Sequence, residues 1–296
     1  MFFKSYLAGK ATTKKTGEVA MDEEQRFAFD TWGFLTIEEA ITEAQVAELK
    51  GAADEKGAML YSQLEKDGGF WSQAYVDLLD LPAISAILDE IFGGARPGGL
   101  PAFRIDHINV HTHGVFNENL AGGRIHGGNG RLLHPARPPE LVPIYFDRNA
   151  ANDTYANGLV TVAFELEDTV CNGGGFGCLA GSHKGHLPVP ETWLDLSAGV
   201  HPMITRVPAR AGSAIIFTEA LSHVTLPWTA PSTRTTLFYK FTEHGEAYSG
   251  EDHFFQPSGA AQWQGVDERK RTILTPPPQA YVHRRRKLAR QEAEKK

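Results

Sequence analysis

The chain has 296 residues, of which 42% are hydrophobic and 22% charged, and one globular domain of this length buries roughly 75% of the surface that its unfolded chain exposes. Its net charge is −7, with +5 on the last 14 residues and −12 on the remainder. A body this acidic argues against a nucleic-acid-binding surface, and no apolar run approaches the roughly 20 residues that cross a bilayer.

The two ends of the chain and its cysteines indicate how it is organised. Residues 1–21 are rich in basic and hydroxyl side chains but lack the apolar core of a signal peptide, so we expect a disordered leader. Residues 283–296 form a basic tail that we expect to be solvated. Cys171 and Cys178 have no second pair with which to build a zinc site, and we expect free thiols in a reducing, cytoplasmic compartment. A single domain is therefore expected over residues 22–282.

Helices are predicted first along the chain, over residues 22–93. Thr42 and Gln45 have the spacing of a capping box, and Val46 and Leu49 continue the segment with apolar residues at helical intervals. A shorter helix is predicted in "LPAISAILDEIF", residues 81–92, because its proline stands at a position that favours helix initiation. We expect these helices to pack on the strands that follow.

From residue 101 onward, short β-type segments alternate with Gly, Pro and Asn. Along residues 159–167, period-two alternation places four apolar side chains on one strand face: Val160, Val162, Phe164 and Leu166. The other clear strand predictions cover residues 103–111, 142–146, 203–208, 213–218 and 235–241. Many short strands separated by turns favour a mainly β sandwich or barrel with flanking helices over a parallel α/β sheet.

Three segments carry the residues with recognisable chemistry: "RIHGG" from residue 124, "GGGFGCLAGSHKGHLPVP" from 173 and "GSAIIFTEALSHVTLPWTAPSTRTTLFYKF" from 212. Their order and spacing over residues 29–241 resemble the phytanoyl-CoA dioxygenase family of iron(II)- and 2-oxoglutarate-dependent oxygenases. The resemblance implies a double-stranded β-helix, or jelly-roll, core. It also implies that His126 and His223 bind iron(II), and that Arg234, helped by Thr225, binds the distal carboxylate of 2-oxoglutarate.

These residue types suit that chemistry on physical grounds. Two histidines and one carboxylate on one face of an iron ion leave positions open for a chelating keto acid and for oxygen. The planar fork of arginine makes two charge-assisted hydrogen bonds to a carboxylate at once. Arg234 falls on the strand face opposite Leu237, Tyr239 and Phe241, and the alternation alone leaves open which face lines a cavity.

Further polar residues in the same region have alternative interpretations. His183 in "GSHK" is expected in a rim loop rather than as a metal ligand. His111 and His113 share one face of the strand that also contains His107, and they are either a second metal site or ordinary hydrogen-bonded strand positions. Near the first motif, three arginines either meet an anionic substrate or are solvated: Arg124, Arg131 and Arg137.

Gly128 departs from the family pattern, which has an aspartate ligand two residues after the first histidine. One interpretation is that the gap accepts chloride, since His-x-Gly resembles the motif of iron- and 2-oxoglutarate-dependent halogenases. A second is that another carboxylate replaces the aspartate, with Glu219 as the leading candidate and Asp106 or Asp147 as others. A third is that the chain has lost iron and is a jelly-roll binding protein.

The sequence thus predicts an enzyme that uses iron(II), 2-oxoglutarate and O2 to oxidise an unactivated C–H bond. Its expected substrate is a small polar or anionic molecule, and the outcome is either hydroxylation or, with chloride as a further ligand, chlorination. Gly128 counts among the residues that decide this outcome. The alternative prediction is a catalytically inactive protein that binds small molecules.

Overall fold

The structure is a computed structural model and describes residues 21–56, 65–66, 69–70, 73–114, 124–128, 146–149, 154–169, 173–185, 187–194, 196, 199–248 and 266–277. Its helices are α1 (Glu23–Trp32), α2 (Glu43–Lys56), α3 (Gln73–Asp77), α4 (Pro82–Ile91), α5 (Glu191–Leu194) and α6 (Glu268–Leu274), with 3-10 turns η1 (Leu78–Asp80), η2 (Pro97–Gly99) and η3 (Ser182–Lys184). Its strands are β1 (Phe34–Ile37), β2 (Glu65–Lys66), β3 (Gly69–Phe70), β4 (Phe103–His113), β5 (Phe146–Asn149), β6 (Thr154–Asn157), β7 (Leu159–Glu165), β8 (Gly175–Cys178), β9 (Thr205–Val207), β10 (Ala214–Thr218), β11 (His223–Leu226) and β12 (Arg234–Glu243).

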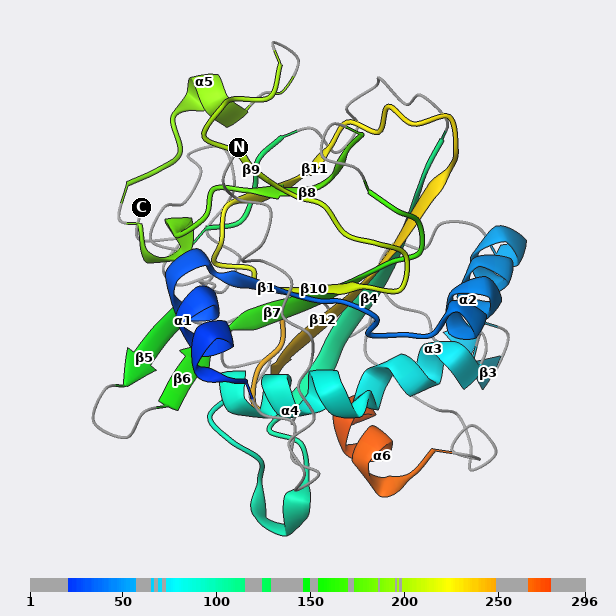
Figure 1. Cartoon of the computed structure of the whole chain (residues 1–296). Coiled ribbons are helices and arrows are strands. Elements are labelled where there is room, and N and C mark those ends of the chain that lie inside the picture. Colours follow the sequence, from blue (N-terminus) through cyan, green and yellow to red (C-terminus); the bar gives the residue numbers. More distant parts are fainter. Residues whose placement is uncertain are drawn as a thin grey trace, which may run out of the picture.

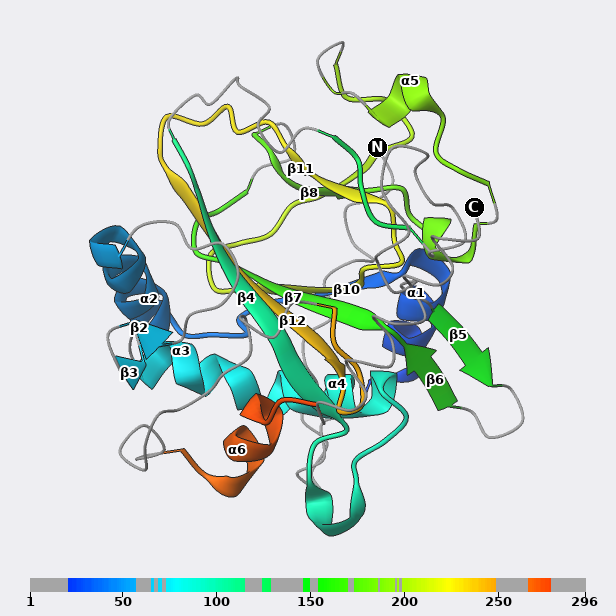
Figure 2. The same ribbon diagram turned by 180° about the vertical axis from the view of Figure 1, so that it is seen from behind.

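Two antiparallel sheets form the centre of the molecule (Figure 1). The larger has the strand order β1-β10-β7-β12-β4, and the smaller has the order β11-β8-β9. Figure 2 shows the smaller sheet above the larger one from the opposite side as well, with the long strands β4 and β12 rising beside it. The prediction of a mainly β fold with antiparallel strands and flanking helices is therefore confirmed.

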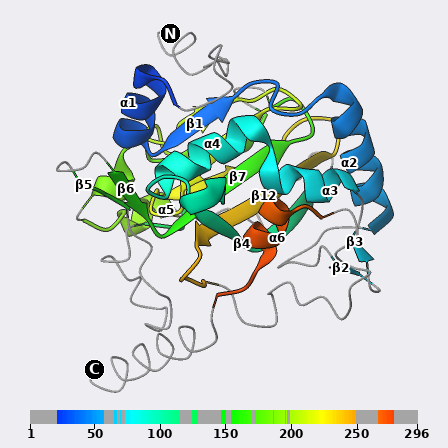
Figure 3. The ribbon, with the colours of Figure 1, turned by 90° about the horizontal axis from the view of Figure 1, so that it is seen from below.

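One face of the larger sheet is covered by helices α3, α4 and α6, as Figure 3 shows from below. The predicted alternation in β7 is confirmed, because Val160, Val162, Phe164 and Leu166 all belong to the core on this helical side. The same core takes in Leu237, Tyr239 and Phe241 of β12. None of the described helices combines the length and apolar composition that a bilayer-spanning segment requires.

The opposite face of the larger sheet packs against the smaller sheet. An aromatic group joins them, with the ring centroids of Phe176 and Phe217 4.5 Å apart and those of Phe34 and Phe176 6.3 Å apart. Cys178 lies in this cluster as a free, buried thiol, and burial raises its pKa. The free thiol predicted there is confirmed, whereas Cys171 lies outside the described residues.

The prediction of helices throughout residues 22–93 is wrong at β1 and at the short pair β2 and β3. Helix α1 begins with a capping box formed by Asp22 and Gln25, and ends at Gly33, whose φ of 83° stops the helix. The next four residues are all buried and pair with β10, so they extend the larger sheet. The capping box at Thr42 and Gln45 is confirmed, with reciprocal hydrogen bonds of 2.9 and 3.2 Å.

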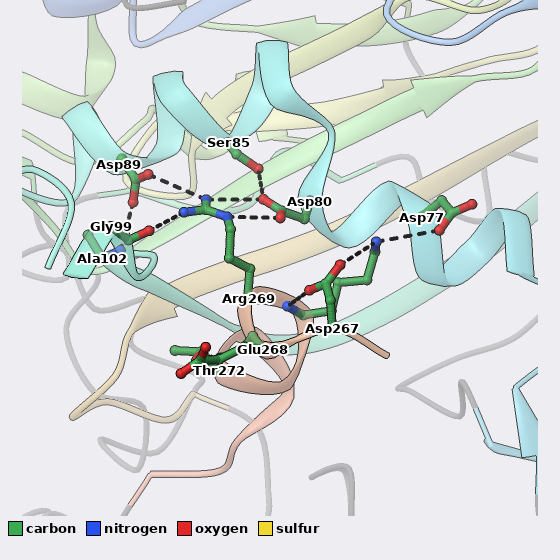
Figure 4. Close-up of polar contacts among 11 residues, drawn as sticks. Asp77, Asp80, Ser85, Asp89, Gly99, Ala102, Asp267, Glu268, Arg269 and Thr272 are labelled. Atoms are coloured by element: carbon green, nitrogen blue, oxygen red, sulfur yellow. Dashed lines mark hydrogen bonds and ion pairs between the residues drawn. The ribbon is translucent and has the colours of Figure 1, made fainter. Parts of the chain in front are cut away.

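Helix α6 is held to the helical layer by ion pairs (Figure 4). Arg269 donates from Nε and Nη2 to the carboxylate of Asp80, at 3.0 and 3.2 Å, and also donates to the carbonyl oxygen of Gly99. Its Nη2 lies 3.8 Å from Asp89. The apolar side of α6 meanwhile buries Ile273 and Leu274 in the main core.

We expect Arg269→Ala to lower the free energy of unfolding by about 1–2 kcal/mol, because a bidentate pair and a backbone contact are lost from a half-buried position. Glu268→Gln changes an exposed residue of the same helix and serves as the control. Urea denaturation of the three proteins measures the difference. Equal midpoints for the two variants would show that α6 is held by its apolar side alone.

Candidate functional site

Two of the predicted site residues, 97 positions apart in the chain, lie directly beside each other. The backbones of His126 and His223 form an isolated antiparallel bridge, with hydrogen bonds of 3.0 Å from the His126 amide and 2.8 Å from the His223 amide. Their ring centroids are 4.4 Å apart. The main chain therefore sets the spacing of the two imidazoles, independently of any ligand.

The His223 ring is oriented by the backbone and by its burial. Its Nδ1 lies 2.7 Å from the carbonyl oxygen of Leu221, so the Nδ1–H tautomer donates there and Nε2 points elsewhere. Burial, and then the nearby His126, lowers the pKa of His223 to about 3. The ring is neutral at neutral pH, which is the form that binds metals. His126 Nδ1 lies 3.1 Å from the carbonyl oxygen of Arg124.

Glu219 lies next to His223, and one of its two carboxylate oxygens is held by hydrogen bonds. Its Oε1 accepts from Thr161 Oγ1 at 2.5 Å and from Lys240 Nζ at 2.6 Å, while Oε2 is 3.7 Å from His223 Nε2. Burial alone would raise the pKa of this carboxyl, but Lys240 and His223 outweigh it and hold the pKa well below its usual range. Within the described residues, no three His, Cys, Asp or Glu side chains converge on one point as a ready metal site.

Arg234 lies on the inner face of β12, toward the smaller sheet. The alternation in the sequence had left open which of the two strand faces this would be. It is 1% exposed and makes a bidentate pair with Glu165 of β7, from Nε at 3.0 Å and Nη2 at 2.6 Å. Thr236 Oγ1 donates to the same carboxylate at 2.9 Å. Nη1 is buried and has no hydrogen-bond partner among the described residues. The guanidinium carbon lies over the Trp228 ring, 5.9 Å from the ring centroid.

Strand β4 carries His111 and His113 on the same inner face. His113 is the cross-strand neighbour of Arg234, and His111 is that of Thr236. The His111 ring lies against the inward Phe238, at 5.1 Å between centroids. The predicted shared face is thus confirmed, but the hydrogen-bonded strand positions are not, because the buried Nε2 atoms of both rings lack partners in the described structure.

The structure also places other residues considered from the sequence. Asp106 is buried and engaged with His107 Nδ1 at 2.7 Å and the Tyr248 amide at 2.8 Å, so its carboxylate supports the β4 strand. His183 is 1% exposed, with Nε2 3.0 Å from the carbonyl oxygen of Asp30, and it packs against the end of α1 and the Phe146 ring of β5 rather than beside the paired histidines.

The structure describes three of the five other residues that the sequence singled out. Asp147 is exposed, and Arg124 pairs with Glu191 at 2.9 Å between exposed side chains. Thr225 is half-buried on β11, two residues after His223 and therefore on the same strand face. Arg131 and Arg137 lie outside the described residues.

Sequence reasoning missed the buried partners Glu165 and Lys240. Both stand at alternating positions of strands that it did identify, and Lys240 shares the face of Arg234 by period two. Charged residues inside predicted apolar strands were the available signal, because such residues are seldom buried without a partner. Glu165 follows Phe164 in β7 and Lys240 follows Tyr239 in β12, so both signals were present in the printed sequence.

Gly127 and Gly128 bring the first motif against the second. Gly127 has a φ of 81°, and a Cβ there would lie 2.5 Å from the Leu221 carbonyl oxygen and 2.8 Å from His223 Nδ1. Gly128 has a φ of 115°, but a Cβ would meet only Ser222 Oγ, at 3.8 Å. Glycine at 127 is therefore required by close packing, and glycine at 128 by backbone conformation.

We expect Gly127→Ala to lower the free energy of unfolding by about 1–3 kcal/mol more than Gly128→Ala does, because both share the strained φ but only the first overpacks against backbone. Guanidinium denaturation of both variants measures this difference. Equal destabilisation would mean that the chain around residue 127 can move away from His223 at little cost.

Comparison with solved structures finds the same overall fold in other proteins. HygX from Streptomyces hygroscopicus, in its apo form, is 19% identical over 82% of this chain and 94% of its own, with a TM-score of 0.62. The HygX complex with nickel, 2-oxoglutarate and hygromycin B gives 18% identity and the same TM-score. SnoK, a non-heme alpha-ketoglutarate-dependent carbocyclase from nogalamycin biosynthesis, is 16% identical over 81% of this chain and 92% of its own, with a TM-score of 0.51. No protein-family model and no curated protein sequence matches the chain.

Proposed function

We propose that this chain is an iron(II)- and 2-oxoglutarate-dependent enzyme with a jelly-roll core that oxidises a C–H bond of a small molecule. One observation carries the proposal: the main chain holds the imidazoles of His126 and His223 side by side, and the inner face of β12 carries a buried arginine whose Nη1 lacks a partner among the described residues. The fold shared with HygX, which has been crystallised with iron and, separately, with nickel and 2-oxoglutarate, supports it. The small-molecule substrate follows the same likeness, since HygX has been crystallised with hygromycin B.

The described side chains do not converge as a preformed metal site, but their donor types suit an iron ion. His223 is neutral and oriented through Nδ1 by a carbonyl oxygen, which is the usual support for a metal-binding imidazole. Two donors that share a metal at about 2.1 Å lie roughly 3–4 Å apart. The 3.7 Å between His223 Nε2 and Glu219 Oε2 falls in this interval. We therefore assign His126 and His223 as ligands and Glu219 as the replacement for the carboxylate that Gly128 lacks.

The residues also fit 2-oxoglutarate. A guanidinium offers two forks, and Glu165 occupies the one formed by Nε and Nη2 of Arg234. The end of the guanidinium that carries Nη1 is left without an acceptor in a position that is 1% exposed. A buried donor without a partner costs about 1–3 kcal/mol. A carboxylate at this end, with Thr225 as a further candidate donor, would remove that cost.

When bound, iron and 2-oxoglutarate supply the oxidising power by activating O2. The residues of the chain would hold and orient the metal ion and the keto acid. The His126–His223 bridge fixes two ligands, and Lys240 and Thr161 hold the Glu219 carboxylate from its Oε1 side. Arg234, itself fixed by Glu165, would anchor the keto acid at its far end. The aromatic layer between the two sheets, which includes Phe217 4.8 Å from the His223 ring, keeps water from the inner side.

Anaerobic addition of iron(II) and 2-oxoglutarate should give the weak visible absorption of an iron-chelated keto acid. His126→Ala and His223→Ala should abolish it, because each removes one of few ligands. Arg234→Lys keeps the charge opposite Glu165 but loses the planar fork, so it should weaken 2-oxoglutarate binding by about 1.5–3 kcal/mol. Absorption titrations measure all three.

His201→Ala is the matched control, since His201 stacks on Trp193 at 4.0 Å and has no part in the site. It should retain the wild-type spectrum. A wild-type protein that binds neither iron(II) nor 2-oxoglutarate would overturn the proposed function and favour the alternative, a jelly-roll protein that binds small molecules without catalysis.

The third position on the metal separates hydroxylation from chlorination. Should Glu219 be the ligand, chloride should have little effect on 2-oxoglutarate affinity and Glu219→Gln should lower iron affinity about as much as the loss of a histidine. Should the space beside Gly128 accept chloride instead, chloride should tighten 2-oxoglutarate binding, because the two ligands complete one coordination shell. Iron content and chloride response of the wild type and Glu219→Gln distinguish the two.

Glu191→Gln, at an exposed residue, is the control for this pair. Gly128→Asp is a less clean test than Glu219→Gln, because aspartate at a φ of 115° strains the backbone whatever it ligates. Iron affinity unchanged in Glu219→Gln, together with no response to chloride, would exclude both assignments of the third position.

A further inference from the structure

Three buried polar atoms that have no hydrogen-bond partner among the described residues belong to the inner face of β4 and β12. They are Arg234 Nη1, His113 Nε2 and His111 Nε2. The first two belong to directly opposed residues, since His113 and Arg234 are a cross-strand pair, and His111 follows two positions along β4. Side chains of opposed strand residues that point to one face lie close enough to act on one ligand.

Electrostatic effects also relate these two histidines to Arg234 and to His126. The pKa of His111 is lowered, first by burial and then by Lys240, Arg234 and His126, so it lies within electrostatic reach of both groups. The pKa of His113 is lowered to about 4 by burial, then by Arg234 and by His111. On the inner face, His113 therefore lies beside Arg234, and His111 lies two positions farther along β4.

A second metal ion does not explain these orphaned nitrogens. The described residues offer no third His, Cys, Asp or Glu that converges with the pair. The cations Lys240 and Arg234 lower the pKa of His111, and the same charges would disfavour a metal ion bound there. A neutral imidazole in its Nε2–H form is a hydrogen-bond donor that a carboxylate oxygen satisfies.

We propose that His113 joins Arg234 in binding the far carboxylate of the keto acid, and that His111 lines the space along its carbon chain. This rests on the proposed function and adds the residue that selects a dicarboxylic keto acid over one without a second carboxylate. Because Glu165 already neutralises Arg234, the arginine offers one fork rather than a whole unpaired charge. Arg234 divides its hydrogen bonds between Glu165 and the carboxylate of the keto acid. A second donor at His113 therefore strengthens the recognition of that carboxylate.

The test compares two keto acids on the iron(II) protein under anaerobic conditions, 2-oxoglutarate and pyruvate. His113→Phe keeps a ring of similar size but has no donor. We expect its Kd for 2-oxoglutarate to rise at least tenfold, equivalent to about 1.4 kcal/mol, with the Kd for pyruvate and for iron(II) changed less than twofold. His113→Gln restores a side-chain N–H and should recover most of the affinity.

If the phenylalanine variant fails to fold, His113→Leu gives the same readout. The matched control is Thr112→Val, at an exposed position on the opposite strand face. Equal loss of affinity for 2-oxoglutarate and pyruvate, or no loss for either, would overturn the assignment of His113 while leaving the proposed function intact. A wild-type protein that binds iron(II) but neither keto acid would overturn both.

Discussion

The backbone bridge between His126 and His223 is the contact on which the rest of the candidate site depends. Two reciprocal hydrogen bonds join a short stretch near residue 126 to the start of β11. Gly127 packs against the Leu221 carbonyl oxygen, the same atom that orients the His223 ring. The spacing of the two imidazoles is thus a property of the main chain, and it exists before any ligand is bound.

Two buried ion pairs extend this arrangement into the interior. Glu219 is held by Lys240 near the paired histidines, and Arg234 is held by Glu165 toward the other end of β12. Burying charges is costly unless each is paired and hydrogen-bonded. Both carboxylates meet that condition with additional hydroxyl donors, from Thr161 and Thr236. Each pair therefore has the partners that a buried charge needs.

The layers around the site explain how such a polar interior is supported. Helices on one side of the larger sheet provide the main apolar core, while the smaller sheet contributes an aromatic layer on the other. The polar residues lie on that second face of β4, β7 and β12, where they share the space with Phe238 and Phe217. The main apolar core and the polar residues of the candidate site therefore lie on opposite faces of the same strands.

The sequence by itself determined the local elements, including the alternation of β7, the capping box at Thr42 and the placement of Arg234 on the strand face opposite Leu237, Tyr239 and Phe241. These follow from period-two and period-3.6 spacing, which a linear chain records directly. The sequence did not predict β1, because the four residues after Gly33 become a strand only by pairing with β10, nearly 180 positions later. Only the tertiary structure decided that Glu165 is the partner of Arg234, that Lys240 holds Glu219 and that His113 faces Arg234. Such partners are chosen by strand register between distant segments, and no local pattern encodes that register.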